Sequence, residues 1–357
     1  MIALTILCAL GLPAGFLLIW RVSVCPPHTS HVVTRFSIVI PARNEEKNLP
    51  RLLTSIAASS TRPLEVIVVD DASTDRTASV AQSFGAKVLA STSLPAGWTG
   101  KSWACHQGAT QAMGDLLLFL DADTYFVSGG LDRVISCWQR ERDQSLVISL
   151  LPYHAMKAAY EQLSLVFNLL MAAGAGGFGG IAAPRLFGQS LLIAKETYRT
   201  AGGHAAVRGV VLENLRFASI LRNSGARIIC FGGSDTLHMR MFPQGFQQMS
   251  ESWAKAFMQG AGDAGVPVLV CATLWISALW STALLLIIYG NNGRAAILVV
   301  YLLFGLQLGW VGRKLGSYSV IACLVYPVPL AYYCLVFGKS AARRALHRKT
   351  AWRGREV

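Results

Sequence analysis

Two aspartates separated by one residue end an apolar run in the stretch DLLLFLDADTYF, residues 115–126. The five apolar residues before Asp121 are typical of a strand that is covered on both faces of a parallel sheet. Asp121 and Asp123 then stand near the carboxyl end of that strand, where open α/β sheets bind their ligands. Neighbouring carboxylates repel each other, and a hard divalent cation compensates them and can also hold a phosphate. The plainer interpretation is a pair of solvated loop aspartates.

Two more acidic stretches follow predicted strands. PARNEE (41–46) ends a strand predicted over 35–42, and DDASTD (70–75) ends a strand predicted over 64–71. Alternation with helices indicates a parallel sheet that is covered by helices on both faces. The three acidic strand ends then share one rim of the sheet and form one site. The other predicted elements are helices over 45–60, 73–85 and 101–113, the second capped by Ser73 and stopped by Gly85, and strands over 86–90 and 146–153.

Four motifs, in this order and spacing, resemble the nucleotide-sugar half of a family 2 glycosyltransferase with the GT-A fold. They are SIVIPARNEEKNL (37–49), VIVVDDASTDRT (66–77), GWTGKSWACHQGA (97–109) and LDAD (120–123). Three later stretches resemble the 4,4'-diaponeurosporenoate glycosyltransferases of bacterial carotenoid pathways, and more loosely hopanoid and ceramide glycosyltransferases. These stretches begin at residues 151, 187 and 239. The resemblance implies a GT-A domain with a mostly parallel sheet and a hexosyltransferase activity.

The resemblance also assigns roles in the donor half. It places Pro41, Glu45 and Asp71 around the uridine of a UDP-sugar. A lysine beside phosphate is a point-charge contact, and a helix amino end adds its dipole, which favours a donor-binding role for Lys101. An exposed lysine in a first helical turn is the ordinary alternative. The implied donor-binding residues are thus Pro41, Glu45, Asp71, Lys101 and Asp121, and the implied ligands of a Mg or Mn ion are Asp121 and Asp123.

The acceptor half departs from the family pattern at one position. Many family 2 members carry Glu-Asp where this chain has Glu213 and Asn214, and in them the Asp is the catalytic base. Glu213 is the remaining carboxylate and the candidate catalytic residue; a glutamate at a helix start is the alternative. A carboxylic acid acceptor is already ionised at pH 7 and needs no base. Asn214 therefore favours an ester-forming enzyme, in which Glu213 orients the acceptor or the sugar.

Composition indicates a membrane protein. The chain is 53% hydrophobic and only 14% charged, which is unusual for a soluble domain. Residues 1–20 carry no charge and are long enough to cross about 30 Å of hydrocarbon. Arg21 follows this run, whereas a signal peptide has its basic residues before it, so we predict an uncleaved anchor. Further apolar stretches cover 266–290, 295–312 and 317–338, the last interrupted by two prolines.

Basic residues predict the orientation. From Lys339 onward the chain has seven Lys or Arg and one Glu, so this tail supplies +6 of the net charge of +13. Such a tail favours the cytoplasmic side and an anionic lipid surface, and no nucleic-acid motif accompanies it. With the catalytic domain and the tail both cytoplasmic, an even number of spans must separate them. Three apolar stretches leave two solutions, in which either 317–338 is re-entrant or 295–312 lies flat.

The predicted protein is a multi-pass cell-membrane enzyme with a cytoplasmic catalytic domain. It would be inverting and metal-dependent, and by resemblance it would transfer glucose from UDP-glucose to a carotenoid acid. One alternative is transfer to another lipid, such as a hopanoid, sphingoid or polyprenyl phosphate. Another is a noncatalytic nucleotide-sugar-binding membrane protein. The expected parts are an anchor (1–21), a nucleotide-sugar half (35–153), an acceptor half with interfacial helices (154–263), membrane segments (266–338) and a basic tail (339–357).

Overall fold

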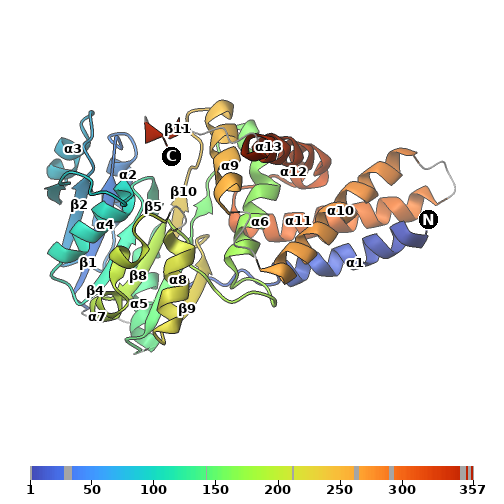
Figure 1. Ribbon diagram of the computed structural model, residues 1–357. Coiled ribbons are helices and arrows are strands. Elements are labelled where there is room, and N and C mark those ends of the chain that lie inside the picture. The colour runs from blue at the N-terminus through green and yellow to red at the C-terminus, as the bar shows by residue number, and fades with distance from the viewer. Residues whose placement is uncertain are drawn as a thin grey trace. The chain divides into compact units, whose positions relative to one another are not determined.

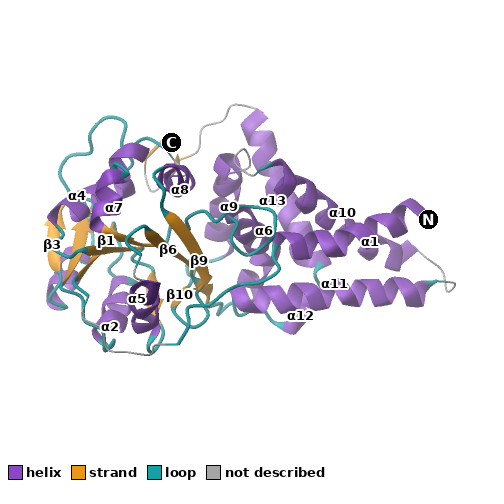
Figure 2. Cartoon of the chain, turned by 90° about the horizontal axis from the view of Figure 1, so that it is seen from below, coloured by secondary structure: helices purple, strands orange, loops and turns teal. Residues whose placement is uncertain are grey.

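The structure is a computed structural model that describes residues 2–27, 34–141, 143–210, 213–260, 265–288, 293–345, 351–352 and 355–356. The chain divides into two compact units. The sheet unit comprises residues 22–155 and 183–240, and the helical unit comprises 1–21, 156–182 and 241–357. Figure 2 shows the long strands gathered in the sheet unit and long helices in the helical unit.

The sheet unit is built on a seven-stranded sheet with the order β3-β2-β1-β4-β8-β6-β9. Neighbours are parallel except that β8 runs antiparallel to both β4 and β6. The predicted mostly parallel sheet is confirmed. Its strands are β1 (Phe36–Ala42), β2 (Glu65–Asp70), β3 (Lys87–Ala90), β4 (Leu116–Leu120), β6 (Leu146–Leu151), β8 (Ser190–Ala194) and β9 (Arg227–Gly232). A smaller sheet joins β5 (Thr124–Phe126), β7 (Tyr153–His154) and β10 (Leu237–Met239).

Helices cover both faces of the large sheet, as its buried strands require. Figure 2 shows α2 (Leu49–Ala57) and α5 (Gly130–Glu141) on one face, and α4 (Gly100–Gln111), α7 (Lys195–Thr200) and α8 (Glu213–Asn223) on the other. The apolar sides of α2 and α5 join the strands in one buried cluster. On the opposite face Gly108 of α4 lies so close to Val39 that a Cβ there would overlap the valine side chain. The sheet unit also contains α3 (Thr77–Ser83) and η2 (Gly203–Val207).

The turn after β2 differs from the sequence-based expectation. The helix predicted from Ser73 begins at Thr77, and Ser73 does not cap it. Instead the Ser73 hydroxyl accepts a hydrogen bond from the backbone N–H of Asn44. Asp75 accepts from the backbone N–H of Thr77, which ties the turn down just before the helix. The predicted stop at Gly85 is confirmed, because its φ of 75° is the left-handed conformation that glycine adopts without strain.

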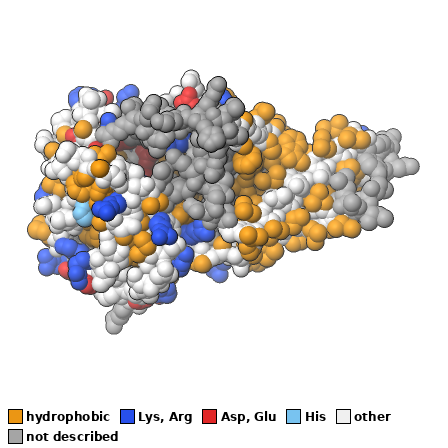
Figure 3. Space-filling view, viewed as in Figure 1, with side chains coloured by type: hydrophobic (Ala, Val, Ile, Leu, Met, Phe, Trp, Pro, Cys, Tyr) orange, Lys and Arg blue, Asp and Glu red, His pale blue; other side chains and the backbone are white. Residues whose placement is uncertain are grey.

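Among the described residues of the helical unit, two helices are long and apolar enough to cross a membrane, α10 (Val266–Ile288) and α11 (Arg294–Leu315). The amino-terminal α1 (Ile2–Leu18) is shorter. The apolar stretch 317–338 is broken into α12 (Val320–Leu324) and α13 (Pro327–Ala345). The other helices are η1 (Ala159–Ser164), α6 (Leu165–Ala175) and α9 (Phe246–Gly260). Figure 1 labels these elements, and Figure 3 shows hydrophobic side chains gathered over the helical unit.

Candidate active site

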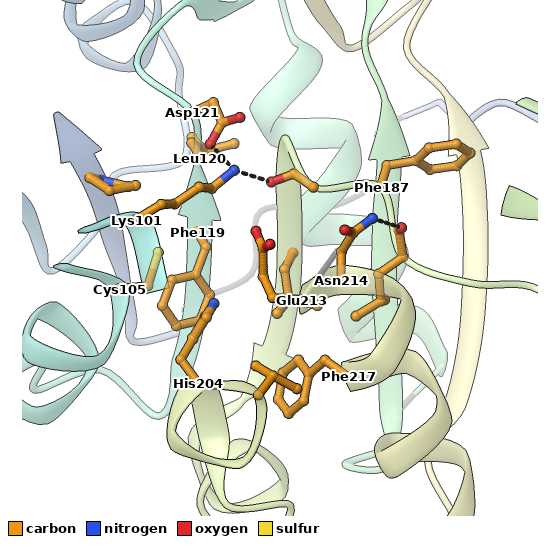
Figure 4. Close-up of a pocket in the computed structure, with 15 residues that line it drawn as sticks. Lys101, Cys105, Phe119, Leu120, Asp121, Phe187, His204, Glu213, Asn214 and Phe217 are labelled. Carbon is orange, nitrogen blue, oxygen red and sulfur yellow. Dashed lines mark hydrogen bonds and ion pairs between the residues drawn. The ribbon is translucent and has the colours of Figure 1, made fainter. Parts of the chain in front are cut away.

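A pocket in the sheet unit lies at the carboxyl ends of β1 and β4 (Figure 4). These strands are parallel neighbours, so their ends meet at one edge of the sheet. The pocket also has walls from the amino end of α4, from η2, from the segment before β8 and from the start of α8. Its lining residues are Pro41, Lys101, Cys105, Phe119, Leu120, Asp121, Leu186, Phe187, Gly188, Leu191, His204, Val207, Glu213, Asn214 and Phe217.

Lys101 is the cation of this pocket. It stands in the first turn of α4, which the Thr99 side chain caps by accepting from the backbone N–H of Ser102. The Lys101 Nζ atom lies 2.6 Å from Asp121 Oδ1 and donates to the carbonyl oxygen of Gly188 over 2.8 Å. Burial favours the neutral amine, but the carboxylates of Asp121 and Glu213 outweigh it and raise the pKa of Lys101. The ammonium therefore stays charged at the strand end.

Glu213 and Asn214 begin α8 and have different surroundings. The Glu213 carboxylate projects into the pocket, where burial raises its pKa against the opposing charge of Lys101 (Figure 4). The Asn214 amide nitrogen instead donates to the carbonyl oxygen of Leu186 over 2.7 Å. Asn214 thus holds the segment before β8, and Lys101 holds the same segment at Gly188. Of the two residues, only Glu213 offers a carboxylate to the pocket.

Pocket residues to which the sequence analysis assigned no role form an apolar wall. His204 lies in η2 beside Phe119 and Phe217, with ring centroids 5.0 and 5.8 Å away. Its Nδ1 atom is 2.8 Å from the Tyr198 hydroxyl, and burial lowers the His204 pKa to about 3. The imidazole is therefore neutral at pH 7. Burial also raises the pKa of Cys105, which keeps its thiol protonated. Cys105 stands four positions after Lys101 on the same helix, so helical spacing could have predicted that the two side chains are neighbours.

The predicted donor-binding and metal-binding residues do not all line this pocket. Pro41, Lys101 and Asp121 do, whereas Glu45, Asp71 and Asp123 lie outside its described lining. Glu45 is buried and accepts from the side chain of Asn48 over 2.8 Å. Asp71 forms an ion pair with Arg43 at 3.5 Å.

Asp123 fits a cation site. Its Oδ1 atom is buried and has no hydrogen-bond partner among the described residues. Burial, together with the charges of Asp121 and Glu45, raises its pKa to about 7. Such a carboxylate needs either a proton or a cation. Within the described ranges no three His, Cys, Asp or Glu side chains gather closely enough to hold a metal ion alone. A magnesium-type ion is commonly held by one or two carboxylates together with substrate phosphates, which suits Asp121 and Asp123.

Comparison with known proteins gives the family. The model of Glycosyl transferase family 2 matches residues 37–211, which include most of the pocket. The 4,4'-diaponeurosporenoate glycosyltransferase of Staphylococcus aureus (strain MRSA252) is 32% identical over 329 residues, which cover 90% of this chain and 87% of that protein. The chain belongs to glycosyl transferase family 2. It is a hexosyltransferase, and its pocket is the candidate active site of that activity.

One further curated protein and one solved structure are similar to this glycosyltransferase. The protein of the same name from S. aureus (strain bovine RF122 / ET3-1) is 30% identical over 363 residues, 99% of this chain and 96% of that protein. The mannosyltransferase PcManGT from Pyrobaculum calidifontis, solved in complex with GDP-Man and Mn²⁺, superposes with a TM-score of 0.58 at 18% identity. That superposition covers 97% of this chain and 98% of the mannosyltransferase. The GT-A fold predicted from the motifs is thereby confirmed.

Proposed function

We propose that this glycosyltransferase transfers glucose from UDP-glucose to a carotenoid carboxylic acid and forms a glucosyl ester. The observation that carries the proposal is the meeting of Lys101 and Asp121, from the donor half, with Glu213, from the acceptor half, in one pocket. The relatives named 4,4'-diaponeurosporenoate glycosyltransferase support a carotenoid acid as acceptor.

The donor would bind with its phosphates at the strand end. Lys101 would meet the negative charge that develops on the leaving diphosphate, because its ammonium is charged and held in place. Asp121 and Asp123 would hold a Mg or Mn ion, which when bound supplies further positive charge for that leaving group. Pro41, Glu45 and Asp71 remain proposed contacts of the nucleoside.

The acceptor reaction would be an in-line displacement with inversion. An oxygen of the acceptor carboxylate attacks the anomeric carbon, the bond from that carbon to the phosphate oxygen breaks, and UDP leaves with the electron pair. No proton has to be removed, because the acceptor is already ionised at pH 7. This suits a pocket in which the Asn214 amide donates to the carbonyl oxygen of Leu186. The position at which the resemblance to family 2 members would place the base then holds a neutral structural contact. Glu213 would then orient the sugar or the acceptor.

The membrane location is part of the same proposal. Helices α10 and α11 would cross the membrane as two spans, and α1 would be an uncleaved anchor with its amino end outside. The break between α12 and α13 supports a re-entrant 317–338, which leaves an even number of spans before the basic tail. The catalytic part and the tail would then both face the cytoplasm. Residues 346–350, 353–354 and 357 of that tail lie outside the described residues.

The test is product analysis with membranes that contain the full chain. UDP-glucose and GDP-mannose are offered separately, each with a carotenoid acid or with the matching carotenoid alcohol. We expect release of UDP only with UDP-glucose and the acid, and a glucosylated product that mild alkali cleaves, as it does an ester. An alkali-stable product from the alcohol would identify an ether-forming enzyme. UDP binding without turnover on any lipid extract would indicate the noncatalytic alternative.

A further inference from the structure

The helices α1, α10 and α11 pack as a block with a defined direction. A Cβ on Gly11 would overlap Ala278, a Cβ on Gly15 would overlap the Trp275 side chain, and Cys8 Sγ lies 3.2 Å from Thr282 Oγ1. As the residue number rises from Cys8 to Gly15 along α1, the number of the contacted residue in α10 falls from 282 to 275. The two helices are therefore antiparallel. Small residues at this spacing allow the close backbone approach that is common between membrane helices.

Helix α11 runs parallel to α1. The side-chain amide of Gln307 donates to the carbonyl oxygen of Leu12 over 2.8 Å and accepts from Trp275 Nε1 over 2.9 Å. Three residues further along α11, Trp310 meets Phe16, four residues beyond Leu12, with ring centroids 5.8 Å apart. One end of the block therefore carries the carboxyl ends of α1 and α11 and the amino end of α10 (Figure 1).

A cluster of aromatic rings lies at this end of the block, beside the carboxyl ends of α1 and α11. We call this cluster the aromatic collar and define it as Phe16, Trp20, Trp310 and Lys314. The rings of Trp20 and Trp310 have centroids 6.2 Å apart, and Phe16 lies 6.0 Å from Trp20. Lys314 Nζ stands 4.4 Å from the centroid of the Trp310 ring. The two indoles nevertheless stay open to the surroundings, with 62% of Trp20 and 44% of Trp310 exposed. Internal packing alone does not account for two large rings left so exposed.

Charge distinguishes this end from the other. Within residues 2–21, 265–288 and 293–315 the charged side chains are Arg21, Arg294, Arg313 and Lys314. Three of these four stand at the collar, and only Arg294 stands at the opposite end. Tryptophan prefers the headgroup level of a bilayer, and an excess of Lys and Arg marks the cytoplasmic side.

We propose that the aromatic collar lies at the cytoplasmic membrane–water interface and binds the headgroups of anionic lipids. The indoles occupy the headgroup level, and Lys314, Arg313 and Arg21 attract the lipid phosphates. The collar thereby sets the depth of the block in the bilayer. The collar also fixes the direction of the block in the membrane, because it places the carboxyl ends of α1 and α11 on the cytoplasmic side. The sheet unit begins at Val22, directly after Arg21. This inference rests on the proposed membrane location.

The experiment uses the full chain reconstituted in vesicles and follows tryptophan fluorescence. Lipids brominated near the headgroup or near the chain end quench at different depths. The difference between the parent and a Trp20→Phe, Trp310→Phe double variant isolates the collar signal, and Trp103→Phe in the sheet unit is the matched control. We expect the collar signal to be quenched most strongly by the headgroup-proximal bromine. Equal quenching at both depths, or none, would overturn the proposal.

Lipid selectivity is measured by brominating only one lipid of a mixture, either phosphatidylglycerol or phosphatidylcholine. We expect phosphatidylglycerol to be favoured by about fivefold for each basic side chain in contact. Lys314→Glu should remove most of this preference, whereas Arg294→Glu should leave it unchanged. Equal preference in both variants would refute the headgroup site. A chain that does not incorporate into vesicles at all would instead refute the proposed membrane location, and UDP release by the variants checks the activity separately.

Discussion

The side-chain amide of Asn214 donates a hydrogen bond to the carbonyl oxygen of Leu186 over 2.7 Å. This contact joins the start of α8 to the segment before β8, which Lys101 also holds through Gly188. A carboxylate at position 214 would face a carbonyl oxygen and lose the donated hydrogen bond. Replacing Asn214 by Asp is therefore predicted to disturb the pocket wall of this enzyme.

Asn214→Asp should accordingly lower kcat/KM on a carotenoid acid. Leaving a buried carbonyl unsatisfied costs about 1–3 kcal/mol, which corresponds to roughly 5- to 150-fold if the whole penalty falls on the pocket. Steady-state kinetics of Asn214→Asp and of Asn214→Ala, which loses the contact without adding a charge, separate the two effects. A faster Asn214→Asp enzyme would show that the chain lacks a base and gains one by this change.

Glu213→Gln keeps the shape of the side chain and removes its charge. With an ionised acceptor we expect kcat to fall by about tenfold or less, well below the 10²–10⁴-fold range of general-base catalysis. The pH profile of kcat should then lack a limb that depends on Glu213. A loss of about a thousandfold with UDP binding preserved would make Glu213 the base and indicate a hydroxyl acceptor.

Lys101→Met should weaken donor binding more than acceptor binding. The change leaves Asp121 without its cation and removes the ammonium from the proposed phosphate site. Hydrogen bonds to charged groups contribute about 1.5–3 kcal/mol, so Kd for UDP should rise roughly 10- to 150-fold. Lys101→Arg keeps the charge and should lose less. Calorimetric titration with UDP measures both variants, and unchanged UDP affinity in Lys101→Met would exclude the donor role.

Asp123 should make the stability of the metal-free protein depend on pH. Its pKa in the folded protein is about 7, above the ordinary aspartate value, because burial and the charges of Asp121 and Glu45 disfavour the carboxylate. As pH rises from about 4 to 7, the unfolded chain loses this proton first, so the folded state loses stability in that window. Asp123→Ala should flatten this part of the curve. Thermal melts without divalent ions, from pH 4 to 8, provide the measurement.

The same variant tests the cation. Asp123→Ala should abolish the increase in UDP affinity that Mn produces and leave the fold intact, as circular dichroism would show. Calorimetric titration of UDP with and without Mn compares the variant with the parent. Metal-enhanced UDP affinity that persists in the variant would exclude Asp123 as a ligand.

Cysteine labelling tests the topology. In a background with the native cysteines replaced by serine, an impermeant reagent added to intact cells should miss single cysteines in the sheet unit and in the tail. A cysteine between α10 and α11 should be labelled, because two spans place that loop outside. Labelling of the tail alone would show that 317–338 crosses the membrane completely.

Local sequence patterns were sufficient to predict the order of strands and helices in the donor half. The apolar runs of β1, β2 and β4 identify strands, because β1 and β4 are buried along nearly their whole length and β2 is buried at its centre. Helix α4 keeps the helical period, because only one side of it is buried. The carboxyl ends of neighbouring parallel strands must meet, which brings Pro41 and Asp121 to one edge before any coordinates are known. The same patterns do not predict that the Asp121 carboxylate lies 2.6 Å from the Lys101 ammonium.

Long-range contacts required the tertiary structure. The strand β8 enters the sheet antiparallel between β4 and β6, an arrangement that its own sequence, SLLIA, does not specify. That insertion carries Leu186 and Gly188 to the pocket, where Asn214 and Lys101 bind their carbonyl oxygens. A side chain read in sequence reveals its chemistry but not its partner. From the sequence, Asn214 is interpreted as the replacement of a catalytic acid. Only the tertiary structure shows that its side-chain amide donates to the carbonyl oxygen of Leu186.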